Sequence, residues 1–378
     1  MVTRIALLGS TGSVGRQTLD VIERHPDTFE VVALAAGKNL DLLREQVRRH
    51  RPKLVVSTAP ASDFVGIESL QTPDGLEAAA TRTDVDLVVF ATSGHDAIPA
   101  TMAAIAAGKH VALANKEAIV CAGDVIMPLA RAHGVTIRPI DSEHSAIWQA
   151  LASGPSASVS RIILTASGGP FRTTPAEALA RVTYEQALKH PNWNMGAKIT
   201  VDSATLANKG LEVIEAHHLF DTPIDRIDVV VHPEQIIHSL VEYEDGNTLA
   251  QLSNPDMRLP IQYALTWPGR LPFPAKPLDL PAIAGLSFEP PDVERFPALR
   301  IAREAGTAGK TYPTVYSAAD EIAVEAFAHG RIRFVDIPGV IEATLAAHDA
   351  ATVASLDDVL DADTWARREA TTHVNAGR

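Results

Sequence analysis

The chain has 378 residues, of which 46% are hydrophobic and 21% charged, a balance typical of a folded globular protein with two or three domains. Its formal net charge of −13 argues against nucleic acid or an anionic membrane as a partner, because both require a positively charged face. Cys121 is the single cysteine, and no signal-peptide pattern or uncharged apolar run of membrane-spanning length is visible. We therefore expect a cytoplasmic protein.

The first element is a short apolar strand over residues 4–8, followed by the turn Gly9-Ser10-Thr11-Gly12-Ser13-Val14-Gly15 and by a helix that ends before Pro26. A strand, a glycine turn and a helix form the setting of a dinucleotide site, since glycine lets the backbone approach a pyrophosphate. The glycines are spaced one residue more loosely than in the common fingerprint. Taken alone, the pattern also fits a tight turn that binds nothing.

The second strand, over residues 30–35, indicates which dinucleotide would bind. Enzymes that use NAD usually end this strand with an acidic residue that contacts the ribose hydroxyls. Here the strand runs into Ala36-Gly37-Lys38-Asn39, with no acid and with a lysine. A cation at this place suits the 2′-phosphate of NADPH, although Lys38 could also be a solvated loop charge.

The next elements alternate between strands and helices, which predicts a Rossmann-like, doubly wound parallel sheet of the α/β class. The expected elements are a helix over 40–47, strands over 54–56 and 85–90, a helix over 98–107, and strands over 110–114 and 135–140.

Polar residues follow two of these strands at the carboxyl edge, where open α/β sheets bind ligands. Asn115, Lys116 and Glu117 follow one strand, and we favour a functional role for Lys116 over a helix-start charge paired with Glu117. Asp141 and Glu143 follow the other. With strand alternation both carboxylates would face one side and reach one ion, although either could instead cap the helix over 144–151.

A second sheet is expected to begin with the strand over 159–166, which ends in Ser167-Gly168-Gly169. Such a turn exposes successive amides and a hydroxyl to an anion such as phosphate, although turns of this kind are common. Strands over 236–243 and 247–252 flank Asp245-Gly246 and predict a hairpin. Exposed antiparallel ribbons of this type often pair subunits.

Between these two regions lies a polar, breaker-rich loop over 190–196 that carries Trp193 and Gly196 and has the composition of a lid. The β-branched segment 198–203 is predicted as a strand or an extended segment, and a helix follows Asn208. Ser203, Asn208 and Lys209 are residue types that hold an oxyanion.

Glu212 lies one helical turn further on. With Asp141 and Glu143 it forms an all-oxygen set that favours Mg²⁺ or Mn²⁺ over structural zinc. His217 and His218 could be metal ligands, but we favour surface or core positions for them.

From residue 267 to 291 the chain carries seven of its 25 prolines and predicts an extended linker. Only helical patterns follow. The predicted domains are a cofactor domain (1–149), a catalytic and dimerisation domain of the α+β type (150–266), the linker (267–291) and a C-terminal helical domain (292–378).

Taken together, these motifs closely resemble the 1-deoxy-D-xylulose 5-phosphate reductoisomerase family. Over about residues 5–330 the chain has, in the family's order, the turn after the first strand and the segments 36–39, 113–117, 141–144, 167–171 and 190–220. The resemblance implies an NADPH- and metal-dependent homodimer that converts 1-deoxy-D-xylulose 5-phosphate to 2-C-methyl-D-erythritol 4-phosphate in isoprenoid precursor synthesis. The metal would be Mn²⁺ or Mg²⁺, with Co²⁺ also compatible.

The resemblance also assigns roles to individual residues. Lys116 and Glu143 match its catalytic groups, and Asp141, Glu143 and Glu212 its metal ligands. The matching substrate contacts are Lys116, Ser142, Glu143, Ser167, His190, Trp193, Met195, Ser203, Asn208, Lys209 and Glu212. The matching cofactor contacts are Gly9, Thr11, Gly12, Ser13, Val14, Gly37, Lys38, Asn39, Asn115, Glu117 and Gly196.

Two segments depart from the family pattern. The loop Ala91-Thr92-Ser93-Gly94-His95-Asp96 lacks the usual glycines, which leaves its cofactor contacts open, and Ser317 and Asp320 stand where asparagine is usual.

Two alternative functions would explain some of these motifs but not all of them. Another NADP-dependent oxidoreductase, acting on a semialdehyde or a polyol phosphate, would leave the three carboxylates without a role. A non-catalytic NADP-sensing module would not need Lys116, the Trp193 loop and the phosphate-binding residues together.

Overall fold

In the computed structural model the chain is described over residues 2–193 and 195–376. It forms two compact units, each assembled from separate segments. The first unit contains Met1–Ala118, Ile126–Ser145 and Asp256–Ala275, and the second contains Ile119–Val125, Ala146–Pro255 and Lys276–Arg378. Within the described residues, no helix is both long and apolar enough to cross a lipid bilayer.

The first unit is built on a seven-stranded sheet of order β4-β3-β2-β1-β5-β6-β7, in which all neighbouring strands are parallel. The strands are β1 Thr3–Leu8, β2 Phe29–Ala36, β3 Leu54–Ser57, β4 Glu68–Gln71, β5 Leu87–Phe90, β6 His110–Leu113 and β7 Ile137–Pro139. Apart from the edge strand β4, whose residues are not buried, the strands are mostly apolar and buried, as expected for strands covered on both faces. The strand order reverses between β1 and β5, which is where such sheets bind nucleotides. The predicted doubly wound sheet is confirmed.

Helices connect these strands and cover the sheet. They are α1 Ser13–Arg24, α2 Leu40–His50, α3 Gly75–Thr81, α4 Ile98–Ala106 and α5 Lys116–Ala132, with the short 3₁₀ turns η1 Ala61–Asp63 and η2 His95–Ala97. Helix α6, Ser142–Leu151, begins three residues after β7 ends at Pro139. The boundary between the two units passes through α5 and α6.

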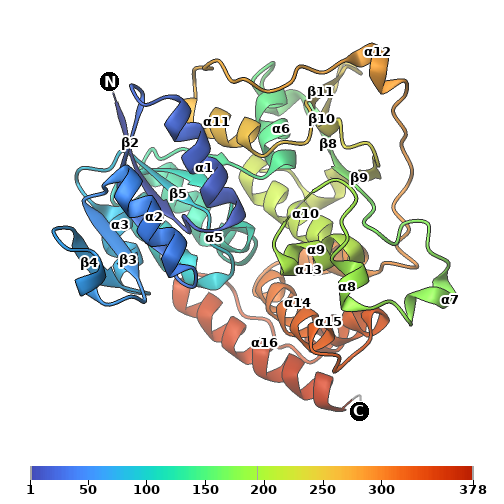
Figure 1. Ribbon diagram of the computed structural model, residues 1–378. Coiled ribbons are helices and arrows are strands. Elements are labelled where there is room, and N and C mark those ends of the chain that lie inside the picture. The colour runs from blue at the N-terminus through green and yellow to red at the C-terminus, as the bar shows by residue number, and fades with distance from the viewer. Residues whose placement is uncertain (1, 194, 377–378) are drawn as a thin grey trace. The chain divides into compact units, whose positions relative to one another are not determined.

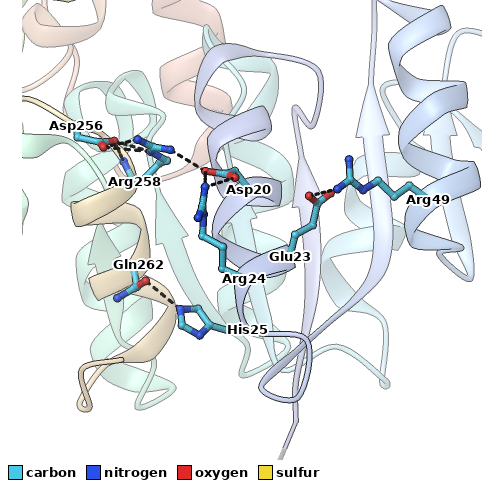
Figure 2. A network of polar contacts seen from close by, with 8 residues as sticks. All are labelled: Asp20, Glu23, Arg24, His25, Arg49, Asp256, Arg258 and Gln262. Carbon is cyan, nitrogen blue, oxygen red and sulfur yellow. Dashed lines mark hydrogen bonds and ion pairs between the residues drawn. The ribbon is translucent and has the colours of Figure 1, made fainter. Parts of the chain in front are cut away.

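Helix α11, Arg258–Thr266, belongs to the first unit although it lies more than a hundred residues beyond β7. It packs against α1 (Figure 1). Figure 2 shows the polar contacts that hold it there: Arg258 bridges Asp256 and Asp20, and Gln262 meets the ring of His25. Between them, Arg24 pairs with the same Asp20. These contacts hold α11 in the first unit, although in the sequence it lies between two segments of the second unit.

The second unit contains a four-stranded sheet of order β11-β10-β8-β9. Its strands are β8 Val159–Ala166, β9 Ile227–Val231, β10 Ile237–Tyr243 and β11 Thr248–Leu252. Strands β10 and β11 form the predicted antiparallel hairpin, and β10 also pairs antiparallel with β8. Strand β11 lies at the edge of the sheet.

The remaining helices of the second unit include the predicted C-terminal helical region, in which α16 lies along α14 and α15 (Figure 1). The helices are α7 Ala176–Leu179, α8 Tyr184–Ala187, α9 Ala197–Thr205, α10 Ala207–Phe220, α12 Leu280–Ile283, α13 Ala298–Ala308, α14 Tyr312–Ala328, α15 Ile337–Ala346 and α16 Leu356–Ala376. Three 3₁₀ turns complete it, η3 Ser156–Ser158, η4 Ile224–Arg226 and η5 Phe334–Asp336.

One predicted strand is wrong. Residues 198–203 lie in helix α9 despite their β-branched side chains. Two local contacts favour the helix: Lys198 pairs with Asp202 at 2.8 Å across one turn, and the Thr200 hydroxyl donates to the Gly196 carbonyl at 2.7 Å. Val201 and Ala204 are fully buried on the inner face, so tertiary packing overrides β-propensity here.

Candidate functional site

The glycine turn after β1 is shaped by close backbone packing at the point where the strand order reverses. Gly9 has φ +90°, and a Cβ there would lie 2.5 Å from the carbonyl oxygen of Ala91, so only glycine fits. The Gly9 and Ser10 amides both donate to the Ala35 carbonyl at 2.9 Å, which ties the turn to β2. Helix α1 begins after Gly12, whose carbonyl accepts from Arg16. The turn therefore presents a helix N-terminus to an anion.

A buried residue that the sequence analysis missed supports this turn. Gln46 of α2 accepts a hydrogen bond from the Ser10 hydroxyl at 2.7 Å and donates to the Ser10 carbonyl at 2.9 Å. Nothing in the local pattern distinguishes Gln46 from an ordinary helix residue, because its partner is 36 positions away.

The residues expected near the 2′-phosphate follow β2 and are exposed. Asn39 caps α2, its side-chain oxygen accepting from the Leu42 amide at 3.2 Å. The Gly37 carbonyl accepts from the Thr58 hydroxyl at 3.0 Å. Lys38 makes no recorded ion pair or hydrogen bond to any described residue, so its ammonium group is available to a ligand.

Asn115 has a structural task in addition to its predicted cofactor contact. It is 1% exposed and caps α5 through the Ala118 amide at 2.8 Å. Its amide nitrogen donates to the carbonyls of Thr92 and Gly94, at 3.2 and 2.8 Å. Asn115 therefore holds the loop after β5, the segment in which this chain departs from the family's glycines.

Lys116 and Asp141 come together at the carboxyl edge of the sheet, because β6 and β7 are neighbours. The Lys116 ammonium lies 2.9 Å from the Asp141 carboxylate, and the Lys116 side chain is almost fully buried. His144, missed in the sequence analysis and fully buried, lies 3.9 Å from the same carboxylate.

Asp141 and Glu143 approach each other, but not for the predicted reason. Strand β7 ends at Pro139, and α6 begins at Ser142, so the two carboxylates are related by a helix start and not by strand alternation. One oxygen of each lies within 4.8 Å of the other. The Ser142 hydroxyl donates to Glu143 at 2.6 Å, and the Ser142 amide donates to Asp141 at 3.1 Å. Capping and ion binding can both use this arrangement.

In the second unit, Ser167 follows β8 and meets three groups that come from different elements. Its hydroxyl lies 3.0 Å from Nε2 of His190 and 3.5 Å from the hydroxyl of Ser203 on α9, and it accepts from the Gly169 amide at 3.1 Å. Nδ1 of His190 accepts from the amides of Asn192 and Trp193, at 3.2 and 3.0 Å. An Nδ1 that accepts leaves the proton of a neutral ring on Nε2, which can then donate to Ser167 or to an anion.

Helix α10 brings Asn208, Lys209 and Glu212 onto one surface. The Asn208 amide and the Lys209 ammonium each donate to a different oxygen of Glu212 at 2.5 Å. Lys209 and Glu212 are 5% and 1% exposed, so the charges of the pair compensate each other in the interior. An anion that reaches this surface would compete with Glu212 for both donors.

The Trp193 side chain is held by two groups of the second unit that the sequence analysis missed. Its indole nitrogen donates to the Gln235 side chain, and its ring lies 6.4 Å from that of His238. Met195 is half-buried, and Gly196 precedes α9. Residue 194, which completes the predicted lid, lies outside the described residues.

The donor chemistry fits a hard divalent cation. Within the first unit, Asp141 and Glu143 offer carboxylate oxygens, the ligands that Mg²⁺ and Mn²⁺ prefer, and within the second unit Glu212 offers the same type of ligand. The two histidines of α10 have other contacts. His217 Nδ1 lies 2.8 Å from the Thr222 carbonyl, and the His218 ring packs against Gly123, which is consistent with the expected surface and core positions.

Sequence comparisons place the whole chain beside one group of enzymes. Residues 5–123 match a family model described as 1-deoxy-D-xylulose 5-phosphate reductoisomerase, and residues 137–220 and 252–369 match two models of the C-terminal domains of that enzyme. A reductoisomerase of this name from Thermomicrobium roseum is 55% identical, with 96% of this chain and 95% of the relative covered. The relative from Geobacter metallireducens is 53% identical, with 97% of each chain covered.

Solved structures of the same enzyme are also similar. The reductoisomerase from Zymomonas mobilis in complex with NADPH superposes with a TM-score of 0.93 at 44% identity, covering 99% of both chains. A reductoisomerase in complex with NADPH, fosmidomycin and magnesium gives a TM-score of 0.93 at 38% identity, covering 99% of this chain and 98% of that chain.

Proposed function

Since the chain belongs to the 1-deoxy-D-xylulose 5-phosphate reductoisomerase family, we infer that it converts 1-deoxy-D-xylulose 5-phosphate to 2-C-methyl-D-erythritol 4-phosphate. The reaction depends on NADPH and on a divalent metal ion. The observation that carries this inference is the similarity over nearly the full length, because both units are matched. The carbon skeleton rearranges to an aldehyde, by retro-aldol cleavage and re-joining, and hydride from NADPH reduces that aldehyde.

Lys116 is the group that binds the reacting hydroxyls and moves their protons. Its ammonium lies 2.9 Å from Asp141 in a nearly dry environment, so it can donate to a substrate oxygen while Asp141 holds it in place. Ser142 and Glu143, the first two residues of α6, bind the substrate beside it. The Ser142 hydroxyl already donates to Glu143 and would orient that carboxylate.

Asp141, Glu143 and Glu212 hold the metal ion. When bound, a divalent cation polarises the substrate ketone and stabilises negative charge on the substrate oxygens. The protein supplies two lysines, Lys116 and Lys209, that compensate the carboxylate charges when no ion is bound. With Asp141 and Glu212 engaged by an ion, Lys116 and Lys209 would be held less strongly by these carboxylates, and both ammonium groups would be available to contact the substrate.

The substrate phosphate binds where Ser167, His190 and Ser203 converge and where Asn208 and Lys209 can turn from Glu212. Two hydroxyls, a ring N–H, a side-chain amide and an ammonium group form a set of donors suited to a phosphate dianion. NADPH lies along the Gly9–Val14 turn, with its 2′-phosphate near Lys38 and Asn39. Trp193 and Met195 close over the substrate and exclude water from the aldehyde.

The first test is an assay of NADPH oxidation by the purified chain. Oxidation should require both a divalent ion and 1-deoxy-D-xylulose 5-phosphate, and the product should be the branched polyol phosphate. Oxidation with a simple semialdehyde in the presence of a chelator would instead identify a metal-independent dehydrogenase. NADPH binding without any turnover would favour the sensing module.

The chain acts as a cytoplasmic homodimer. The edge strand β11 supports the dimer, because Leu249 and Leu252 on it are each 37% exposed and its outer backbone groups face no other strand of the sheet. The charge of −13 and the single buried cysteine suit a reducing compartment.

A further inference from the structure

The first unit has a cavity of about 340 Å³ at the amino edge of its sheet, where β1, β2, β5 and β6 begin. Four strand-start residues contribute to its wall, and the end of α11 with the segment after it closes the other side. Its lining includes Phe29, Asp86, His110, Arg138, Trp267 and Arg270. The volume is within the range of small-molecule sites. The nucleotide turn lies at the opposite edge of the same sheet.

Arg138 of β7 is the unusual feature of this cavity. It is 8% exposed, yet no carboxylate among the described residues lies within ion-pair distance of its guanidinium. Its one recorded hydrogen bond runs from Nη1 to the Ala264 carbonyl at 2.9 Å, and Nε is buried without a partner. A buried cation with an unsatisfied donor is costly unless an anion or another acceptor meets it.

The neighbouring charged groups do not compensate Arg138. Asp86 is engaged by Arg4, which binds both carboxylate oxygens at 2.9 and 2.7 Å. Burial and the nearby Arg138 lower the pKa of His110, so this ring is neutral near pH 7 and adds no charge of its own. Arg270 adds a second cation at the rim, with its guanidinium carbon 4.5 Å from the centre of the Tyr263 ring. Among the described residues, no carboxylate therefore offsets the charge of Arg138 in the wall of this cavity, although the chain as a whole is strongly acidic.

The walls beside Arg138 are flat and apolar. The Trp267 ring lies 5.4 Å from the guanidinium carbon of Arg138, and Phe29, Leu87, Leu265 and Leu271 line the rest of the cavity. We propose that this cavity is a binding site for a small organic anion, a carboxylate or phosphate monoester with a flat apolar body. The anionic group would bind Arg138, and the body would pack against Trp267 and Phe29.

This site is distinct from the site for NADPH. Strand β1 runs from Thr3, in the cavity wall, to Leu8, just before Gly9, and its six residues span about 20 Å. A ligand in the cavity would therefore not compete with NADPH for space, and both could be bound at once.

Benzoate is the probe for this proposal, with benzamide as its neutral isostere. Each is titrated into the full chain saturated with NADPH and free of divalent metal, and binding is followed by calorimetry and by the ¹⁵N-indole resonance of Trp267. We expect benzoate to bind and to shift that resonance, and benzamide to bind at least tenfold more weakly. Loss of a charge-assisted hydrogen bond accounts for a change of this size.

Arg138→Met is the matched variant, since it removes the charge and keeps an apolar side chain of similar length beside Trp267. It should weaken benzoate binding at least tenfold. Arg161→Met removes an arginine that is paired with Asp228 and Glu242 in the second unit, and it should change binding less than twofold. If Arg138→Met does not fold, the proposal is tested by comparing benzoate and benzamide binding to the unchanged protein. Equal binding of the two probes, an unshifted Trp267 resonance or no binding at all would overturn the proposal.

Discussion

At the scale of single residues, Lys38 is the clearest determinant of cofactor choice. It is exposed after β2, and its ammonium group has no recorded partner among the described residues. We expect Lys38→Ala to weaken NADPH binding ten- to a hundredfold and to leave NADH binding unchanged, because one charge-assisted phosphate contact contributes about 1.5–3 kcal/mol. Cofactor titrations at constant ionic strength measure this. Arg48→Ala, an equal loss of charge on the exposed face of α2, is the control. Equal use of both cofactors by the unchanged protein would contradict the assignment.

Glu212 is the residue on which the metal assignment depends most, because it comes from a different unit from Asp141 and Glu143. Glu212→Gln should weaken Mn²⁺ binding at least tenfold and leave NADPH binding intact. It also removes the carboxylate that lies 2.5 Å from the buried Lys209 ammonium, so the melting temperature without metal should fall as well. Titration with Mn²⁺, followed by electron paramagnetic resonance, measures the affinity for the ion. Calorimetry measures the melting temperature. Glu325→Gln, at an exposed position of α14, is the control. Normal metal-dependent turnover in Glu212→Gln would refute the role.

At the scale of elements, α10 is expected to make the stability of the protein pH-dependent through His218. The ring packs against Gly123 of α5, where a Cβ would lie 2.4 Å from it. The pKa of His218 is lowered from 6.5 to about 4, first by burial and then by the neighbouring His217, against a smaller opposing effect of Asp124.

Because the folded pKa is depressed, the unfolded chain binds more protons between pH 4 and 6.5. Stability is therefore full above pH 6.5 and falls as the pH decreases toward 4, by at most about 3 kcal/mol from this residue. Urea unfolding at pH 7 and pH 5 measures the difference. His218→Leu should reduce the difference, and an identical pH dependence in that variant would show that other groups control it.

The loop that carries Trp193 is the element whose behaviour we expect to change with ligand. In the structure its indole is held by Gln235 and lies near His238. His190 binds the backbone of this loop through Nδ1 and Ser167 through Nε2, so phosphate binding and loop position are linked by one ring. Trp193→Ala should leave NADPH affinity within twofold and reduce both turnover and substrate affinity at least tenfold. Protease cleavage near Trp193 should slow when a phosphonate substrate mimic is added. Equal cleavage at saturating ligand would mean that the loop is not a lid.

Elements set by local pattern could be predicted from the sequence, and those set by distant packing could not. The apolar runs of β1, β5 and β8 and the hairpin around Asp245-Gly246 follow directly from their residues. Helix α9 could not be predicted in this way, because its β-branched residues favour a strand. The contacts that favour the helix, the Lys198–Asp202 pair and the burial of Val201, are visible only in the structure. In the same way, strand spacing placed Lys116 at the sheet edge, but its pairing with Asp141 depends on β6 and β7 lying side by side.

For the molecule as a whole, the order of segments along the chain differs from their grouping in space. The predicted domains are continuous, whereas the first unit also contains Asp256–Ala275, which α11 anchors through Arg258 and Gln262. No local signal in α11 indicates this return, because its partners Asp20 and His25 lie more than 230 positions earlier. The predicted domain boundaries stay predictions.

The second sheet is where we expect two copies of the chain to meet. Strand β11 is an edge strand with Leu249 and Leu252 each 37% exposed, and an uncovered apolar edge promotes pairing with another chain. Sedimentation equilibrium of the unchanged protein should give a dimer of twice 40.3 kDa.

Leu249→Lys combined with Leu252→Lys should shift that equilibrium toward monomer by at least tenfold in dissociation constant, because two charges would be desolvated at the contact. Val65→Lys, at a residue of the first unit that is 91% exposed, changes an apolar side chain away from the edge and should leave the dimer intact. Circular dichroism before and after the change shows whether the subunits stay folded. A folded double variant that remains as dimeric as the Val65→Lys control would place the subunit contact elsewhere, and a monomeric unchanged protein would exclude the dimer.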